Sequence, residues 1–369
     1  YPEAIAAAND VHECMLDAYC SAQRAAPGER RMFWCHDAFG VAGLTWDDAV
    51  RLLAENGFTD LLTNQAWGGV AYYESEVLSV TPEIRERGDQ LAACLAACKK
   101  YGIACHVWKV NWNMSSRSPE AFRAKMESDS RTQVQRSGSP KQGWLCPSNP
   151  LNQQLEIDAM VEIAAKYDVA GIHFDYIRYP DRDSCFCAGC RKRFEDRLGK
   201  PVAGWPSDVL SEGALRQAWL DFRRDQITRV VAAVSEAARQ ARPGIAVSAA
   251  VFPNWPTDRD ALGQDWKVWC DRGYLDFVCP MDYTPHTPKF EAMAKQQISW
   301  AGNVPCYPGI GLSVWPNGDA IISLIDQIEV TRRLKTGGFS IFNYGPAEAA
   351  AILPRCGLGI TRIQRHSSP

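Results

Sequence analysis

The chain has 369 residues, of which 46% are hydrophobic and 22% are charged, with a formal net charge of -3. These values are typical of a globular protein with a large core, and they give no basis for binding nucleic acid or an anionic membrane. No apolar run approaches the ~20 residues needed to cross a bilayer, so we expect no membrane span.

The first segment, EAIAAANDVHECMLDAYCSAQ, predicts a helix that precedes the repeating part of the chain. We therefore divide the chain into a helical extension at 1–29 and a single domain at 30–369. Within this domain, strand-like runs alternate with amphipathic, helix-like runs. The predicted strands are 30–37, 59–64, 103–111, 170–175, 245–254, 275–282, 304–312 and 338–343.

These strands are mostly apolar, with β-branched and aromatic residues, which is typical of a parallel sheet covered by helices. Eight strand–helix units close a (β/α)8 TIM barrel, and we predict this α/β fold. A doubly wound open sheet is the alternative, but no G-x-G-x-x-G turn follows the first strand. Long loops at 112–147 and 179–214 follow strands three and four, at the end of the barrel where active sites lie.

Polar side chains gather at the C-terminal ends of the predicted strands, whereas the strand beginnings look plain. This asymmetry predicts an active-site rim. Aromatic residues follow the same strand ends, and their faces can stack on sugar rings while polar neighbours bind hydroxyl groups. Loop packing is an equally good explanation for any single aromatic residue. The predicted substrate-binding residues are His36, Asp37, Asn64, Trp67, Trp108, Asn111, His173, Tyr176, Arg178, Asn254, Trp255, Tyr283, Trp315 and Asn343.

Glycoside hydrolysis commonly uses two carboxyl groups on either side of the scissile bond. Strand ends supply three candidates, Asp37, Asp175 and Asp282. We predict Asp175 and Asp282 as the catalytic pair, because only one strand lies between the two strands that carry them. Arg178 would hold Asp175 ionised as a nucleophile or stabiliser, and Asp282 would act as the general acid. The competing interpretation is that each Asp caps a helix or ties a loop.

The strand-four stretch GIHFDYIRYP, with WLCPSNP at 144–150 before it, resembles glycosyl-hydrolase-like family ten, relatives of bacterial glycan-strand hydrolases. The resemblance implies hydrolysis of a polysaccharide or peptidoglycan-like glycan, with Asp175 as the matched site residue. This chain has Asp-Tyr at 175–176 where many relatives have Asp-Asp, and it has no Glu at the end of strand seven. A signal peptide or other upstream segment is expected to be missing before Tyr1, and we expect a secreted or periplasmic bacterial protein.

Cysteines form a C-x-C-x-x-C pattern at Cys185, Cys187 and Cys190, in the loop after strand four. Three thiolates at this spacing can occupy three corners of a structural zinc site, with Cys146 or Cys14 as the fourth ligand. A disulfide with one free thiol is the competing interpretation. We expect no catalytic cofactor in either case.

The sequence therefore predicts a glycoside hydrolase that binds a polysaccharide or oligosaccharide and cuts within the chain, between the two long rim loops. One alternative is a non-catalytic carbohydrate-binding barrel, which the missing strand-seven Glu keeps open. A second is a metal-dependent polysaccharide deacetylase or hydrolase, for which His36, Asp37 and His173 would have to supply ligands.

Overall fold

Eight parallel strands form the centre of the molecule in the computed structural model, which describes residues 1–315 and 320–362. The strands follow the chain in the order predicted. They are β1 (Arg30–Cys35), β2 (Asp60–Trp67), β5 (Ala104–Val110), β8 (Gly171–Asp175), β9 (Ala246–Val251), β10 (Phe277–Pro280), β11 (Gly309–Gly311) and β12 (Gly338–Phe342).

The strands pair in the order β10-β9-β8-β5-β2-β1-β12-β11. Two isolated bridges, Val278 to Cys306 and Met281 to Gly309, join the two outer strands of this path and nearly close the barrel. The predicted (β/α)8 fold is confirmed. Strand seven is shorter than predicted because Pro305 and Pro308 have no N–H group to donate to a neighbouring strand.

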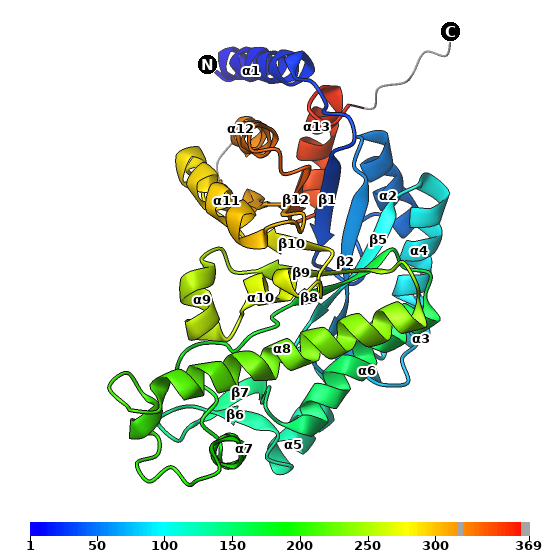
Figure 1. Ribbon diagram of the computed structural model, residues 1–369. Helices are drawn as coiled ribbons and strands as arrows, with labels where there is room; N and C mark the ends of the chain where they lie inside the picture. Colours follow the sequence, from blue (N-terminus) through cyan, green and yellow to red (C-terminus); the bar gives the residue numbers. More distant parts are fainter. Residues whose placement is uncertain (316–319, 363–369) are drawn as a thin grey trace.

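Helices surround the barrel and cover the outer face of the strands (Figure 1). The covering helices are α2 (Trp46–Glu55), α4 (Gln90–Tyr101), α6 (Pro150–Lys166), α8 (Arg216–Ala241), α10 (Trp266–Asp271), α11 (Thr287–Ala301), α12 (Ala320–Arg333) and α13 (Leu353–Leu358). The Thr45 side chain caps α2, and the Asn149 side chain caps α6. No helix in the described part of the chain is both long and apolar enough to cross a membrane.

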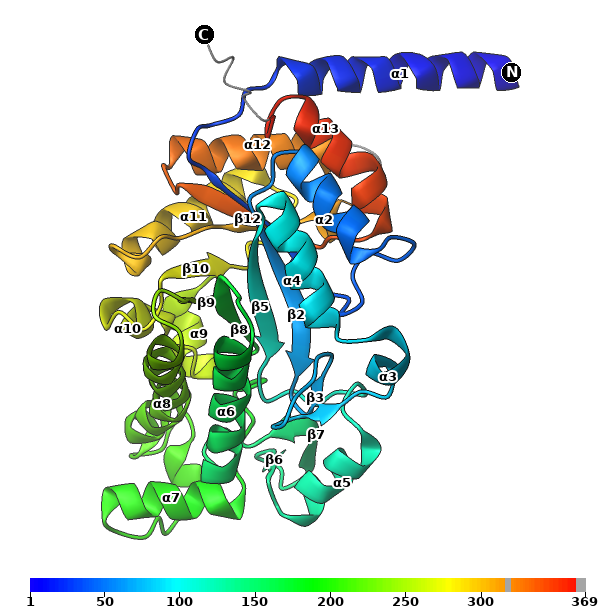
Figure 2. The same ribbon diagram turned by 90° about the vertical axis from the view of Figure 1, so that its right-hand side faces the viewer.

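The predicted N-terminal helix is α1 (Pro2–Ala22), which lies outside the barrel and contacts α13. Figure 2 shows α1 at one end of the molecule and the rim insertions at the other, beyond the arrowheads of β2 and β5. The rim insertions contain β3 (Val70–Ala71), β4 (Ser79–Val80), α3 (Glu83–Arg87), α5 (Glu120–Ser128), β6 (Thr132–Val134), β7 (Pro140–Leu145), α7 (Ala188–Leu198) and α9 (Trp255–Leu262).

Alternate side chains of each strand fill the barrel, as Met32 and Trp34 of β1 do, while Phe33 and Cys35 face the helices. The N-terminal end of the barrel holds a buried ionic group. The Asp60 carboxylate accepts a hydrogen bond from Arg30 Nε at 2.9 Å and lies 3.0 Å from His106 Nε2. The expectation that the strand beginnings are plain was therefore wrong, since this group closes the opposite end of the barrel from the rim.

Candidate active site at the barrel mouth

A cavity of about 260 Å³ opens at the C-terminal ends of the strands. Its walls are mainly aromatic, which suits the flat face of a sugar ring. One carboxyl group, that of Asp175, lies among the lining residues. They are Trp34, His36, Trp67, Trp108, Asp175, Tyr176, Ala250, Met281, Tyr283 and Phe342.

Asp175 ends β8 and is 5% exposed. Burial raises the pKa of its carboxyl group to about 6, because the charged form loses hydration. The Tyr176 backbone N–H donates to Asp175 Oδ1 at 2.7 Å and, with the nearby Arg178 charge, partly offsets this rise in pKa. The Trp108 indole also lowers the pKa, although its N–H lies outside hydrogen-bond geometry with every described acceptor. The carboxyl group can therefore hold a proton near neutral pH.

The backbone turns sharply at Tyr176, which has a φ of 52°. This left-handed conformation is uncommon for an aromatic residue and costs on the order of 1 kcal/mol. It carries the chain from β8 into the rim loop while keeping the Tyr176 ring in the cavity wall, 5.8 Å from the Trp144 ring.

Arg178 does not form the ion pair with Asp175 that we predicted. Its guanidinium lies over the rings of Tyr176 at 4.8 Å and Phe252 at 4.6 Å, and Nη1 donates to the Tyr179 carbonyl at 3.0 Å. Arg178 thus packs the rim loop and acts on Asp175 only as a nearby charge.

His36 stands between two walls of the cavity, with its ring 5.7 Å from Trp67 and 5.5 Å from Trp108. Arg117, from the loop after β5, lies over Trp67 and has Nη2 3.4 Å from His36 Nδ1. Burial and the Arg117 charge both lower the pKa of His36. Neutral His36 can donate or accept a hydrogen bond to a sugar hydroxyl.

His173 was predicted to bind substrate. It is completely buried beneath the cavity and does not line it. Its Nε2 accepts the Trp34 indole N–H at 3.2 Å, which leaves Nδ1 to donate to Ser248 Oγ at 2.8 Å. Burial holds the pKa of His173 well below its usual value. Neutral His173 therefore fixes the orientation of Trp34 in the cavity floor.

Asp282 is also buried, but it does not line the cavity with Met281 and Tyr283. Its Oδ1 accepts a hydrogen bond from Gln297 Nε2 of α11 at 2.6 Å. Burial raises the pKa of Asp282 well above its usual value, because the charged form loses hydration. The structure thus does not bring together the Asp175–Asp282 pair that the sequence predicted, because successive side chains at the end of this strand face opposite sides.

Several other predicted binding residues support the rim and do not line the cavity. Asn111 donates to Glu156 of α6 at 2.6 Å, and Asn343 Oδ1 accepts the His36 backbone N–H at 3.0 Å. Asp37 is exposed and accepts from the backbone N–H of Phe39. The positions outside the cavity lining are Asp37, Asn64, Asn111, His173, Arg178, Asn254, Trp255, Trp315 and Asn343.

Four cavity residues were missed by the sequence analysis, namely Trp34, Ala250, Met281 and Phe342. Strand alternation provides a signal for two of them. Trp34 shares a face with His36, and Met281 shares one with Tyr283. Arg117 was missed as well, because nothing in a long loop marks which residue folds back over the barrel.

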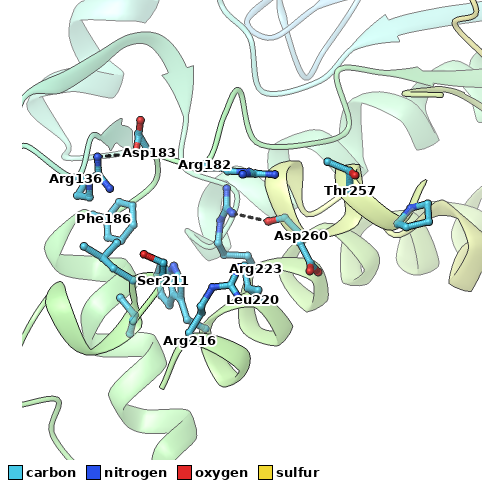
Figure 3. Close-up of a pocket in the computed structure, with 14 residues that line it drawn as sticks. Arg136, Arg182, Asp183, Phe186, Ser211, Arg216, Leu220, Arg223, Thr257 and Asp260 are labelled. Carbon is cyan, nitrogen blue, oxygen red and sulfur yellow. Dashed lines mark hydrogen bonds and ion pairs between the residues drawn. The ribbon is translucent and has the colours of Figure 1, made fainter. Parts of the chain in front are cut away.

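A larger cavity, of about 510 Å³, lies between the loop after β8 and helices α8 and α9 (Figure 3). Its two carboxylates are already paired, Asp183 with Arg136 at 3.4 Å and Asp260 with Arg224 at 2.5 Å. Since both carboxylates of this cavity are engaged in ion pairs, we assign the candidate active site to the smaller cavity at the barrel mouth.

Metal-ligating residues gather elsewhere in the described part of the chain. His36, Asp37 and His173 form no ligand cluster, and the groups with suitable spacing are Cys146, Cys185, Cys187 and Cys190, and Cys94, Cys98 and Cys105. The geometry therefore gives no support to a catalytic metal site at the rim.

Solved structures with a similar fold include the PgaB (BpsB) glycoside hydrolase domain from Bordetella bronchiseptica. It has a TM-score of 0.70 and 12% sequence identity, over 89% of this chain and 97% of that domain. The catalytic domain of a β-amylase from Paenibacillus polymyxa matches with a TM-score of 0.62 and 11% identity, over 90% of this chain and 95% of that domain. These likenesses show the barrel fold.

The sequence of this chain is similar to proteins of two kinds. The chain is 21% identical over 259 residues to the glycosyl hydrolase DigH of Escherichia coli strain K12, which covers 62% of this chain and 55% of DigH. It is 26% identical over 215 residues to an S-layer-related protein of Niallia circulans, covering 47% of this chain and 13% of that protein. The chain therefore spans only part of the length of these curated relatives.

The family model described as glycosyl hydrolase-like 10 matches residues 46–312, from α2 to the end of β11. This match covers most of the chain and confirms the family predicted from the strand-four stretch. The chain belongs to the glycosyl hydrolase-like 10 family.

Proposed function

We propose that this chain hydrolyses glycosidic bonds of a polysaccharide, with Asp175 as the general acid. The observation that carries the proposal is a carboxyl group at the end of a barrel strand, facing an aromatic cavity, with a pKa raised to about 6. A general acid works best when its pKa is close to the working pH. Family membership supports a glycosidase-type reaction.

The roles predicted for the two Asp residues change in this proposal. Asp175 takes the acid role, because its pKa is raised and the predicted Arg178 ion pair is not formed. Asp282 takes no catalytic role, since it contacts Gln297 and lies outside the cavity lining. A single carboxyl group at the cavity departs from the usual pair of acids in glycosidases.

In some glycosidases the substrate supplies the second reacting group. We infer that the substrate carries a 2-acetamido group. The carbonyl oxygen of this group bonds to the anomeric carbon as the bond from that carbon to the leaving oxygen breaks. The leaving oxygen takes the proton of Asp175. Water then attacks the anomeric carbon, the bond from this carbon to the acetamido oxygen breaks, and a proton of the water moves to Asp175. His36 and Tyr283 are polar groups of the lining that can hold the acetamido group.

The rim insertions after β5 and β8 flank the cavity and provide surface for further sugar units, which supports cleavage within a glycan chain. An export location, in the periplasm or outside the cell, would bring the protein to such glycans.

The test is product analysis by mass spectrometry on matched glycans that differ only in N-acetylation, with Asp175→Asn as the control. We expect fragments of intermediate length from the acetylated glycan, none from its de-N-acetylated form, and none from the variant. Equal cleavage of both forms would contradict the role of the acetamido group while leaving hydrolysis established.

A non-catalytic carbohydrate-binding barrel is the second candidate, favoured by the lone carboxyl group in the cavity. It predicts binding of a glycan without products, and it predicts that Asp175→Asn binds as well as the wild type. Product formation that depends on Asp175 would exclude it.

A further inference from the structure

Four cysteines from two different rim insertions meet at one point. Cys146 follows β7, Cys185 and Cys187 lie in the loop after β8, and Cys190 lies in the first turn of α7. Their sulfur atoms all lie within 4.8 Å of one another. Of the two fourth ligands considered from the sequence, the structure brings in Cys146, while Cys14 is exposed on α1.

Two of the distances between these sulfur atoms are close to the edge of a tetrahedron of sulfur ligands around a metal ion. Cys146 Sγ lies 3.8 Å from Cys187 Sγ and 3.4 Å from Cys190 Sγ. Zn–S bonds of about 2.3 Å in a tetrahedral site place neighbouring sulfur atoms about 3.8 Å apart, whereas a disulfide needs about 2.05 Å. We propose that Cys146, Cys185, Cys187 and Cys190 bind one structural zinc ion that joins the insertion after β5 to the loop after β8.

Local backbone geometry favours the thiolate form that zinc requires. Cys187 is the N-cap of α7, a helix of 11 residues, and the Cys190 backbone N–H donates to Cys187 Sγ at 3.4 Å. The positive end of the helix dipole and this N–H group both stabilise a negative sulfur.

Two arginines, the half-buried Arg193 and the buried Arg223, lie near the cluster and are opposite in sign to its expected charge. Four thiolates around Zn²⁺ carry a net charge of about -2. Arg193 donates to Ser148 Oγ at 2.9 Å and has Nη2 4.0 Å from Cys146 Sγ, and Ser148 Oγ lies 3.0 Å from Cys190 Sγ. The Ser148 hydroxyl, which accepts from Arg193, can therefore donate its own proton to the Cys190 sulfur.

Arg223 supports the zinc site independently of the cysteine geometry. It is 2% exposed, and among the described residues its guanidinium hydrogen-bonds backbone carbonyl groups and forms no ion pair with a carboxylate. Its guanidinium donates to the carbonyl groups of Asp181 at 2.8 Å and Ser184 at 2.9 Å, next to Cys185. It also donates to the Asp260 carbonyl group at 3.2 Å, and Figure 3 shows these two residues. A buried cation without a counter-charge is costly, and a doubly negative zinc–thiolate group beside Ser184 provides that charge.

A second cysteine group serves as an internal comparison. Cys94, Cys98 and Cys105 pack between α4 and β5, and their sulfur atoms are as closely spaced. This group has three members, lacks a fourth ligand among the described residues, and comes from neighbouring elements of the barrel wall. We therefore assign it to core packing.

The zinc ion would hold the rim next to the candidate active site. Cys146 lies two residues after Trp144, whose ring contacts Tyr176 in the cavity wall. Loss of the ion should loosen this wall without changing the barrel itself.

Metal analysis of the full chain, purified under reducing conditions from zinc-containing medium, tests the proposal. We expect one zinc per chain, with X-ray absorption showing four sulfur neighbours. Cys146→Ser should lose most of the zinc, and the matched Cys105→Ser should retain it. No metal, iron in place of zinc, or a disulfide among the four cysteines in mass spectra would overturn the proposal. If Cys146→Ser fails to fold, the absorption spectrum of the wild type decides alone.

Hydrogen exchange gives a readout that does not depend on activity. Removing zinc with a chelator should speed amide exchange at 140–147 and 181–190, and leave 94–105 unchanged. Unchanged exchange in both rim segments would contradict the structural role of the ion. Neither result depends on whether the glycosidase proposal holds.

Discussion

The carboxyl groups of Asp175 and Asp282 lie on opposite sides of the barrel wall. Asp175 lines the aromatic cavity, whereas Asp282 contacts Gln297 of α11 among the surrounding helices. Burial raises the pKa of both groups. A raised pKa alone therefore does not identify a catalytic acid, and access to the cavity separates the two.

The pH dependence of activity should follow the protonation of Asp175. Its pKa of about 6 means that the acid form is present below pH 6 and declines above it. We expect kcat/KM to fall about tenfold per pH unit on the alkaline side, with an apparent pKa near 6. A profile that stays flat from pH 5 to pH 9 would be inconsistent with Asp175 as the general acid.

Asp175→Asn should remove activity and stabilise the fold at neutral pH. The unfolded carboxyl group ionises near pH 4 and the folded one near pH 6, so wild-type stability falls across this interval and stays lower above it. A shift of about 2 pH units corresponds to about 3 kcal/mol as an upper bound. Urea unfolding at pH 4 and pH 7.5 measures the difference, which should be near zero at pH 4. A variant destabilised at pH 7.5 would indicate a structural role for the ionised group.

Asp282→Asn is the matched control for Asp175→Asn. Because Asp282 lies outside the cavity lining and accepts its hydrogen bond from Gln297 through Oδ1, an amide of the same shape can keep that contact. We expect activity within a few-fold of wild type and stability within about 1 kcal/mol. A loss of activity similar to that of Asp175→Asn, in a folded protein, would restore Asp282 to the mechanism.

Sequence periodicity was sufficient to predict the barrel, its eight strands and the position of Asp175. Apolar runs and helix caps are local signals, and the count of strand–helix units determines how the sheet closes. The side that each strand-end residue faces was less predictable. Adjacent residues such as Met281 and Asp282 face opposite ways, so an error of one position moves a residue from the cavity to the helices.

Long-range pairing explains the remaining differences. Lys109, near the end of β5, is completely buried and its Nζ lies 2.5 Å from Glu156 Oε2 of α6. Cys146 joins cysteines about 40 residues further along the chain, and Arg117 reaches His36 from a loop. The first contact joins a barrel strand to its covering helix, and the other two depend on how the insertions fold over the rim. A single sequence contains no local signal for any of them.

Breaking the Lys109–Glu156 pair should be strongly destabilising. Glu156 also accepts from Asn111 at 2.6 Å and from the Trp112 backbone N–H at 3.0 Å. Glu156→Ala leaves the Lys109 ammonium buried without a counter-charge, which typically costs about 3–5 kcal/mol. The double variant Lys109→Met with Glu156→Leu should recover part of the loss in thermal unfolding. If Glu156→Ala and the double variant were equally stable, the unpaired charge of Lys109 would not be the cause of the destabilisation.

Trp67 and Trp255 allow the sugar-stacking role of the aromatic rim to be tested by a matched pair of substitutions. Trp67 lines the cavity beneath Arg117, whereas Trp255 begins α9 and donates its indole N–H to Asp265 at 2.6 Å. Trp67→Ala should weaken glycan binding about tenfold, equivalent to about 1.4 kcal/mol, through loss of the ring face. Trp67→Phe should recover part of the affinity, because a smaller ring still stacks. Trp255→Phe should leave affinity unchanged and lower stability through the lost hydrogen bond.

Titration calorimetry with an oligosaccharide in the Asp175→Asn background measures binding without turnover. Equal losses of affinity at both positions would indicate that the glycan extends over α9 and is not confined to the cavity at the barrel mouth.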